Sequence, residues 1–595
     1  MQEEFTSQEG SDAKEWQGWI DKKACDVLTV EESEEIRRSK PELIVPTRWV
    51  RTNKNEGVAD ADFKAKSRLV VQGFRDKALG RYRRDAPTAS QIAESILLCV
   101  CSFYQFIMLC KDVKNGYFCG KPLDREVYLE QPRGGLPGLA QRQLLRARKA
   151  IYGFAEAARL FWLALREHLI SDGWKESVLE PALFYHRDEE GVLNGILITH
   201  VDDLEGGVRP GLEEKLFQKS SQSLDFATNH RFSFTFRGRE IKQSEKKDEH
   251  GNVCGGYIDV CMRNYALSMS KITVSKERRA QPEADLTEEE QRILNSGAGE
   301  LGWISKQLRS DLAFDNGCVQ RCKKKPKVSD LLRLKTAVEA ARRGADVRMR
   351  FWDDVDLQNG VILHLADSGH ANGTPEHDEI KRYRSIGGYY ILIANPEVLE
   401  GKPARANILA FNSSQTKRVC RSTLAAEASH LSESIECGDW IIVVLHEALH
   451  GSVDLRNWTD VIQQRKRIYV TDARSVFDYL HKEACSTSSD KRMAIEGALL
   501  RETVRKEGAD VRWIDGQQNM ANVLTKVNTD KTILNQFLRD GLFSLIQTDA
   551  NRQQKLKQQL QRKARKAKEK NNECENQQFP ATTAGATSPF EHKNP

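Results

Sequence analysis

The stretch LNGILITHVDDLEGGV, residues 193–208, decides how the chain is interpreted. An apolar run leads into two adjacent aspartates, Asp202 and Asp203, and the chain then turns polar and Gly-rich. The pattern predicts a β-hairpin with two carboxylates at its tip. An aspartate pair in a turn is usually a solvated cap. However, close carboxylates that repel one another are also typical of sites that hold divalent cations.

The composition bounds the class of protein. A chain of 595 residues is too long for one hydrophobic core, so several domains are expected. The net charge of +6 argues only weakly for an anionic partner. The 13 cysteines form no CxxC pair, which favours reduced thiols in the cytosol or nucleus. The polar N-terminus is unlike a signal peptide and polar residues interrupt the apolar stretch 95–110, so no membrane role is expected.

The pattern of apolar and charged residues divides the chain into five expected segments. These are a polar, mobile leader at 1–40, alternating strand-like and helix-like runs at 41–240, a more charged segment at 241–355, a second α/β pattern at 356–545 and a basic low-complexity tail at 546–595. The tail is interpreted as a solvated, helix-prone extension. Nucleic-acid affinity and nuclear import are the alternatives for it.

A third carboxylate is available at Asp112, which ends the apolar segment in IMLCKDV, residues 107–113. Around it, four motifs follow in order: AKSRLVVQGF (65–74), KDVKNGYFCGKPLDREVYLEQPRG (111–134), RKAIYGFAEAARLFWLAL (148–165) and ITHVDDL (198–204). This order and spacing resemble the reverse transcriptase of copia-type LTR retrotransposons. The resemblance implies that Asp112, Asp202 and Asp203 hold two Mg²⁺ ions, with Mn²⁺ as the alternative, for nucleotidyl transfer.

The same resemblance assigns the nucleotide contacts. Tyr117 falls where the family keeps an aromatic ring that lies against the incoming sugar and excludes a 2′-hydroxyl; an ordinary core aromatic is the alternative. Lys66 and Arg68 fall in the fingers segment, where they contact triphosphate or template or are solvated strand charges. Tyr152 and Gly153 match the segment that supports the nucleotide and template.

Several residues depart from the family pattern. His200 stands where the family has a tyrosine before the aspartate pair, and Ala155 replaces a family lysine. Glu205 lies where the outgoing strand is usually apolar. None of these changes removes a metal ligand.

The resemblance continues downstream, where the chain is similar to the RNase H domain of the same polyprotein. The segments LHLADSGHA (363–371), CRSTLAAEASHL (420–431), IYVTDARSV (468–476) and GQQNMANVLTK (516–526) carry it. It implies that Asp367, Glu427 and Asp472 converge on metal ions that activate water against an RNA phosphodiester. The family's fourth acid falls at Asn522, which is expected to be a neutral ligand that holds a second metal more weakly.

The expected fold is therefore multidomain, α+β and α/β: a right-hand polymerase with fingers, palm and thumb, followed by an RNase H-like domain. The expected function is that of an RNA-directed DNA polymerase from a copia-like Pol polyprotein, with an attached RNase H-like domain. Its expected partners are an RNA template, a DNA primer, the RNA–DNA hybrid and dNTPs, in a cytoplasmic or nuclear retrotransposon particle. A decayed or co-opted copy that only binds hybrids, and a nuclease with an inactive polymerase, remain as alternatives.

Nothing upstream of these motifs resembles Gag, an aspartic protease or integrase. The chain is accordingly interpreted as a fragment, a processed product or a truncated copy of a Pol polyprotein.

Overall fold

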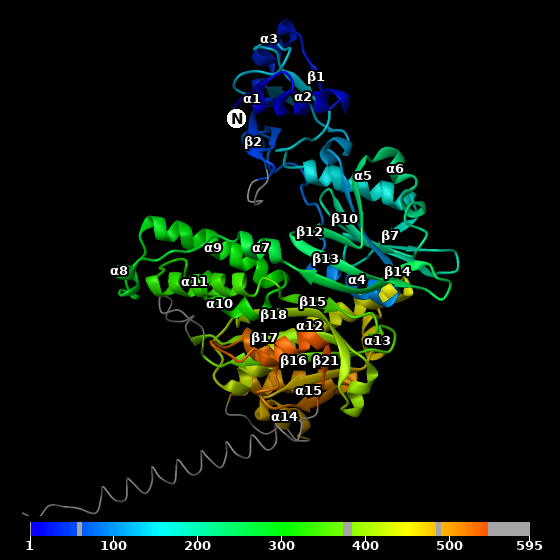
Figure 1. Cartoon of the computed structure of the whole chain (residues 1–595), viewed down its shortest axis with the longest axis vertical. Coiled ribbons are helices and arrows are strands. Elements are labelled where there is room, and N and C mark those ends of the chain that lie inside the picture. The colour runs from blue at the N-terminus through cyan, green and yellow to red at the C-terminus, as the bar shows by residue number, and fades with distance from the viewer. Residues whose placement is uncertain (1, 56–61, 373–382, 483–489, 546–595) are drawn as a thin grey trace, which may run out of the picture. The chain divides into compact units, whose positions relative to one another are not determined.

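Four β-sheets and their covering helices organise the described part of the chain (Figure 1). The structure, a computed structural model, describes residues 2–55, 62–372, 383–482 and 490–545. Within these residues no helix is both long and apolar enough to cross a membrane. The mixed α+β, multidomain class expected from the sequence is confirmed. The expected basic tail, 546–595, lies outside the described residues, and the other segment boundaries stay predictions.

The first sheet occupies the segment expected to form the fingers and has the strand order β1-β6-β5-β2-β3. Its two long strands pair antiparallel, from Thr47 opposite Val71 to Asn53 opposite Ala65. Burial alternates along β3 because successive side chains point to opposite faces of a sheet, and only one face is covered. The strands are β1 (Cys25–Val27), β2 (Ile44–Asn53), β3 (Ala65–Val71), β5 (Tyr128–Glu130) and β6 (Leu145–Ala147).

Residues 2–39 are folded onto this sheet, so the expectation of a mobile leader is wrong. Trp19 is completely buried in the fingers core, and Trp16 is nearly so. Asp12 accepts hydrogen bonds from Arg51 of β2 at 2.5 Å and from Ser67 of β3 at 2.5 Å. The expectation rested on the polar composition of the whole segment. It overlooked two tryptophans three residues apart, which form one apolar face of a helix. The helices are α1 (Gln2–Thr6), α2 (Ser11–Asp21) and α3 (Val30–Ser39).

The second sheet, in the expected palm, has the order β11-β4-β10-β9-β8-β7. Helix α5 (Ala157–Ser171) covers one face, where Phe161, Leu165 and Leu169 join the core formed by the strands. Helix α4 (Gln91–Phe103) is buried over most of its length, because it also packs against strands of the other sheets. The strands are β4 (Ile107–Val113), β7 (Trp174–Glu176), β8 (Leu183–Arg187), β9 (Leu193–His200), β10 (Asp203–Val208) and β11 (Phe226–Arg231).

The third sheet and a group of helices form the segment expected to be thumb and connection. The four antiparallel strands follow the order β12-β13-β14-β15. Helices α9 (Glu288–Gln307), α10 (Ala313–Cys322) and α11 (Val328–Arg343) pack side by side (Figure 1). A capping box at Thr287 begins α9. The strands are β12 (Ser233–Phe236), β13 (Arg239–Lys247), β14 (Val253–Cys261) and β15 (Arg348–Phe351).

A buried ionic cluster joins the palm to the turn between β12 and β13. Glu94 of α4 is 0% exposed and forms ion pairs with Arg239 and, at 3.4 Å, with Arg237. Glu205 of β10 is also 0% exposed. Burial, and then the charge of Glu94, raises the pKa of the Glu205 carboxyl. Since buried charges are costly unless they are compensated, the ion pairs of Glu94 with Arg237 and Arg239 bind α4 to the β12–β13 turn.

The fourth sheet, in the expected RNase H-like domain, has the order β20-β19-β16-β17-β18-β21. Strands β16, β17 and β18 are antiparallel, whereas β19 pairs parallel with β16 and with β20. Helix α12 (Thr423–His450) packs along β16 and β17. The remaining elements include β16 (Val361–Gly369), β17 (Ile386–Ala394), β18 (Ala404–Gln415), β19 (Arg467–Thr471), β20 (Asp510–Trp513), β21 (Leu542–Phe543), α14 (Arg474–His481) and α15 (Lys491–Glu507).

His364 is a residue of β16 whose ring lies against α12, and it is completely buried. Its Nδ1 donates to the carbonyl oxygen of Ser434 at 3.0 Å, and its ring packs against Tyr469. Burial, reinforced by the charge of Arg467, lowers the pKa of His364 from 6.5 to about 3. The native state therefore holds this imidazole neutral, whereas the unfolded chain protonates it below its ordinary pKa.

We expect this depressed pKa to make the fold acid-sensitive. As pH falls from 6.5 towards 3, His364 is protonated in the unfolded state but not in the native state. The free energy of unfolding therefore decreases by about 1.4 kcal/mol per pH unit. His364→Asn, which keeps a donor for Ser434, should have a flatter dependence of the thermal midpoint on pH between 7.5 and 5. Parallel curves for the wild type and the variant would contradict the assignment.

Candidate active sites

Three carboxylates meet where two interior strands of the palm sheet, β4 and β10, have their ends. In the antiparallel pairing of β4 with β10, Asp203 stands directly opposite Asp112. Asp202 occupies the turn between β9 and β10, and its carbonyl oxygen accepts a hydrogen bond from Val113 at 3.0 Å. One carboxylate oxygen from each of the three residues lies within 4.8 Å of the others. The structure thus brings together the three acids that the motif order singled out.

The turn that presents Asp202 is strained. Val201 and Asp202 form a two-residue connection, with His200 paired to Asp203 across it. Val201 has a φ of 58°, in the left-handed region. This region normally requires glycine at the first position of such a hairpin turn, and it is unfavourable for a β-branched residue. Strain of this kind persists only where the surroundings impose it, and it is concentrated at functional sites.

The three carboxylates carry more negative charge than their surroundings neutralise. Among the described residues, no lysine or arginine forms an ion pair with Asp112, Asp202 or Asp203. Burial, followed by the charges of Asp202 and Asp112, raises the pKa of Asp203 to about 6. Burial also raises the pKa of Asp202. Hard oxygen ligands with uncompensated charge fit Mg²⁺ or Mn²⁺, so the residues present suit a divalent metal.

An aromatic and basic wall lies beside this triad. The ring of Tyr117 contacts that of Tyr152 edge-on, with centroids 4.8 Å apart, and the Arg68 guanidinium lies 5.6 Å from the Tyr152 centroid. Lys66 and Arg68 are two residues apart on β3 and therefore face the same way. Burial, and then the charge of Arg68, lowers the pKa of Lys66, while Asp112 opposes this effect. The structure places all four predicted nucleotide contacts near the acids.

Gly153, the fifth predicted contact, is required by the backbone. It has a φ of +100°, and a Cβ atom there would lie 1.9 Å from the carbonyl oxygen of Val71. The close approach arises because the N–H of Val71 donates to the Tyr152 carbonyl oxygen at 2.8 Å. Glycine at this position therefore lets the segment that carries Tyr152 dock on the edge of β3.

Gly153→Ala should separate this close approach from ordinary glycine strain. Gly134 has a similar φ of +94°, and a Cβ there meets no atom within 4 Å. We expect Gly134→Ala to cost about 1 kcal/mol of stability, from the φ angle alone. Gly153→Ala should cost at least about 2 kcal/mol more, since the clash forces the Tyr152 segment off β3. Urea unfolding measures both, and equal losses would show that the docking is unimportant.

His200, the residue that departs from the family tyrosine, is half-buried beside the triad. Its ring lies edge-on to Phe236 of β12, with centroids 6.3 Å apart. Burial, together with the nearby Arg237, lowers the pKa of His200. The planar side chain is therefore held neutral and packed against the β12–β13 turn.

A second carboxylate triad lies in the RNase H-like segment. Asp367 is on β16 and Asp472 directly follows β19, and the parallel register of these strands, Ala366 opposite Thr471, sets the two acids side by side. Glu427 projects from the second turn of α12. Oxygens of the three acids lie within 4.8 Å of one another. Burial and the neighbouring carboxylates raise the pKa of Glu427, and burial followed by Asp367 raises that of Asp472.

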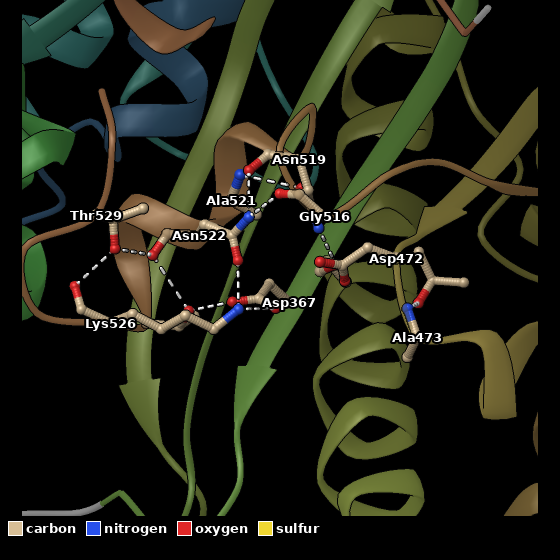
Figure 2. Close-up of polar contacts among 12 residues, drawn as sticks. Asp367, Asp472, Ala473, Gly516, Asn519, Ala521, Asn522, Lys526 and Thr529 are labelled. Carbon is tan, nitrogen blue, oxygen red and sulfur yellow. Dashed lines mark hydrogen bonds and ion pairs between the residues drawn. The ribbon is translucent and has the colours of Figure 1, made fainter. Parts of the chain in front are cut away.

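Sequence reasoning missed two partners of this triad, Thr525 and Lys526. The Thr525 hydroxyl donates to Oδ2 of Asp367. The Lys526 ammonium lies 3.0 Å from Oδ1 of Asp367 (Figure 2). Asn522, the predicted neutral ligand, accepts a hydrogen bond from Lys526. A threonine and a lysine that follow a short helical turn look like solvated residues in the sequence. Only the return of the chain to β16 reveals their position.

Comparison with known proteins identifies the first of these regions. Residues 35–209 match the family described as reverse transcriptase (RNA-dependent DNA polymerase). This range contains Asp112, Asp202 and Asp203, together with the aromatic wall. Residues 35–209 are therefore similar to the reverse transcriptase of copia-type retrotransposons. The resemblance stated from the motifs is thereby confirmed for this domain.

Curated relatives are retrovirus-related Pol polyproteins. A polyprotein from transposon RE2 of Arabidopsis thaliana is 28% identical over 162 residues, or 27% of this chain and 11% of the relative. One from transposon TNT 1-94 of Nicotiana tabacum is 21% identical over 509 residues, or 81% of this chain and 34% of the relative. The chain thus spans about a third or less of their length.

Among solved structures, a foamy viral protease-reverse transcriptase in complex with double-stranded DNA matches with a TM-score of 0.45 and 11% identity. The match covers 85% of this chain and 70% of that chain.

Proposed function

We propose that the chain is an RNA-directed DNA polymerase that extends a DNA primer with dNTPs on an RNA template. The observation that carries the proposal is the uncompensated triad of Asp112, Asp202 and Asp203 within the reverse transcriptase domain. These carboxylates would hold two divalent ions, which would supply positive charge to the phosphates and to the attacking and leaving oxygens. Mg²⁺ is the proposed ion, with Mn²⁺ as a substitute.

Other features of the chain would position the metal ligands and bind the incoming nucleotide. The β4–β10 register holds Asp112 opposite Asp203, so the ligands are positioned before substrate arrives. Arg68 and Lys66, on one face of β3, are placed to bind the triphosphate or the template phosphates. Tyr117, whose ring contacts that of Tyr152 edge-on, is the proposed surface for the incoming sugar. In this role its ring leaves no room for a 2′-hydroxyl.

Primer extension on an RNA template tests the polymerase. Asp112→Asn should reduce the extension rate by at least about 1,000-fold, because several kcal/mol of charge stabilisation are lost with the metal ligand. Asp225→Asn is the matched control, since Asp225 is an exposed carboxylate whose partner is Lys114. It should extend primers like the wild type. A wild-type chain that binds hybrids tightly but extends no primer would support the decayed copy instead.

Sugar discrimination tests Tyr117 separately. Tyr117→Ala should raise the incorporation of rNTPs relative to dNTPs by about tenfold or more, since it removes the ring proposed to exclude the 2′-hydroxyl. Phe161→Leu is a suitable control because Phe161 packs on Tyr117 from the core, with ring centroids 6.3 Å apart. Competing rNTP and dNTP incorporation at one template position gives the ratio. Unchanged discrimination with extension intact would make Tyr117 an ordinary core residue.

We further propose that the second triad cleaves the RNA strand of an RNA–DNA hybrid. Asp367, Glu427 and Asp472 supply three carboxylates from separate elements. Such a group suits a divalent ion that activates water for attack on a phosphodiester. The pKa values of Glu427 and Asp472 are raised for the reason that applies in the palm, namely carboxylates crowded in a buried place. A hybrid with a labelled RNA strand measures this activity independently of primer extension.

A further inference from the structure

The two triads differ in one respect. The palm triad forms no ion pair with any lysine or arginine that the structure describes. In the second triad, Lys526 forms one with Asp367 at 3.0 Å, and Asp367 itself is 1% exposed. A cation that belongs to the protein is therefore already present at the second triad.

Asn522 holds Lys526 in place, and its own orientation is determined by the backbone. The Asn522 Nδ2 donates to the carbonyl oxygens of Asn519, at 3.0 Å, and Gly516. Both of these partners can only accept, so the amide nitrogen must face them and the amide oxygen must face away. That oxygen accepts from the Lys526 ammonium (Figure 2). A carboxylate at this position would instead face two carbonyl oxygens.

The loop that carries Asn522 is itself anchored to the catalytic strand. Asn519 donates to the carbonyl oxygen of Ala366 on β16 at 3.0 Å and accepts from the N–H of Ala521 at 3.0 Å. The Thr525 hydroxyl donates to the second oxygen of Asp367. The ammonium is thus held at one oxygen of Asp367 by a series of contacts that begins and ends on β16.

The formal charges indicate how many metal ions such a site accommodates. When all three are ionised, as metal ligands are, Asp367, Glu427 and Asp472 contribute three negative charges, and Lys526 offsets one of them. One divalent ion neutralises what remains, whereas two would leave a buried excess of positive charge. Burying uncompensated charge is strongly unfavourable. A second divalent ion beside Asp367 would also have to displace Lys526 from its oxygen.

We propose that Lys526 is a fixed cation that takes the place of a second divalent ion, so that the RNase H-like site binds a single metal. The inference rests on the proposed nuclease function and concerns how that site is charged. In this arrangement Asn522 is not a metal ligand. It positions the ammonium, which is then available to contact a nucleic-acid phosphate beside the one metal ion.

Metal stoichiometry tests the proposal without reference to activity. The parent is the full chain with Asp202→Asn, which removes a ligand from the palm triad. Mn²⁺ binding is followed by calorimetry and by electron paramagnetic resonance, where two neighbouring Mn²⁺ ions show a spin-coupled spectrum. Sites that disappear on adding Asp472→Asn are those of the second triad. The parent should bind one uncoupled Mn²⁺ there.

Lys526→Met in the same parent should bind two Mn²⁺ ions, which give a spin-coupled spectrum. It should bind the first ion at least about tenfold more tightly than the parent does, because a neighbouring positive charge has been removed. Lys531→Met is the matched control. Lys531 lies 3.0 Å from a carboxylate oxygen of Asp311, an acid outside the triad. The control should bind one ion, like the parent.

The failures are distinguishable. Two coupled Mn²⁺ ions at the second triad of the parent, or one ion with unchanged affinity after Lys526→Met, would overturn the role of Lys526 and leave the nuclease proposal standing. The absence of any Asp472-dependent Mn²⁺ in the parent and in Lys526→Met would overturn both. The first of these outcomes does not depend on whether the Lys526 variant folds.

Discussion

Each of the two acidic sites must hold three like-charged side chains close together against their mutual repulsion. In each half of the described chain, three carboxylates are held with their oxygens within 4.8 Å of one another. The carboxylates repel one another, so the surrounding fold must hold them together. In the palm, the hydrogen-bonded register of β4 with β10 holds them, and in the second site the parallel register of β16 with β19 does so. Extensive burial of these strands makes both registers rigid.

The two sites differ in how the negative charge of their three carboxylates is compensated. In the palm the charge is left uncompensated, and the adjoining turn tolerates Val201 at a φ of 58°. In the RNase H-like segment, Lys526 and Thr525 occupy both oxygens of Asp367. An uncompensated site depends on cations from solution, while an internally paired one has part of its charge supplied by the fold. The difference lies in side chains brought by one loop, not in the acids.

Short-range patterns and motif order were sufficient to predict much of the site. Asp112 and the Asp202–Asp203 turn were expected together because of the order and spacing of the motifs that contain them. The contacts of Asn522 were not expected, because the sequence shows an amide but not which way it points. That direction is set by the carbonyl groups of Gly516 and Asn519. The buried pair of Glu94 and Arg239 was missed since 145 residues separate its members, and no local pattern links them.

The folded N-terminal helices have a practical consequence for producing the protein. The match to the reverse transcriptase family begins at residue 35, a natural place to start a recombinant polymerase domain. Such a start would delete the helix that carries Trp16 and Trp19 and would uncover the apolar surface they occupy in the fingers core. It would also leave Arg51 without its Asp12 partner. The exposed apolar surface would favour aggregation on expression, and the low yield would be mistaken for an intrinsic instability of the domain.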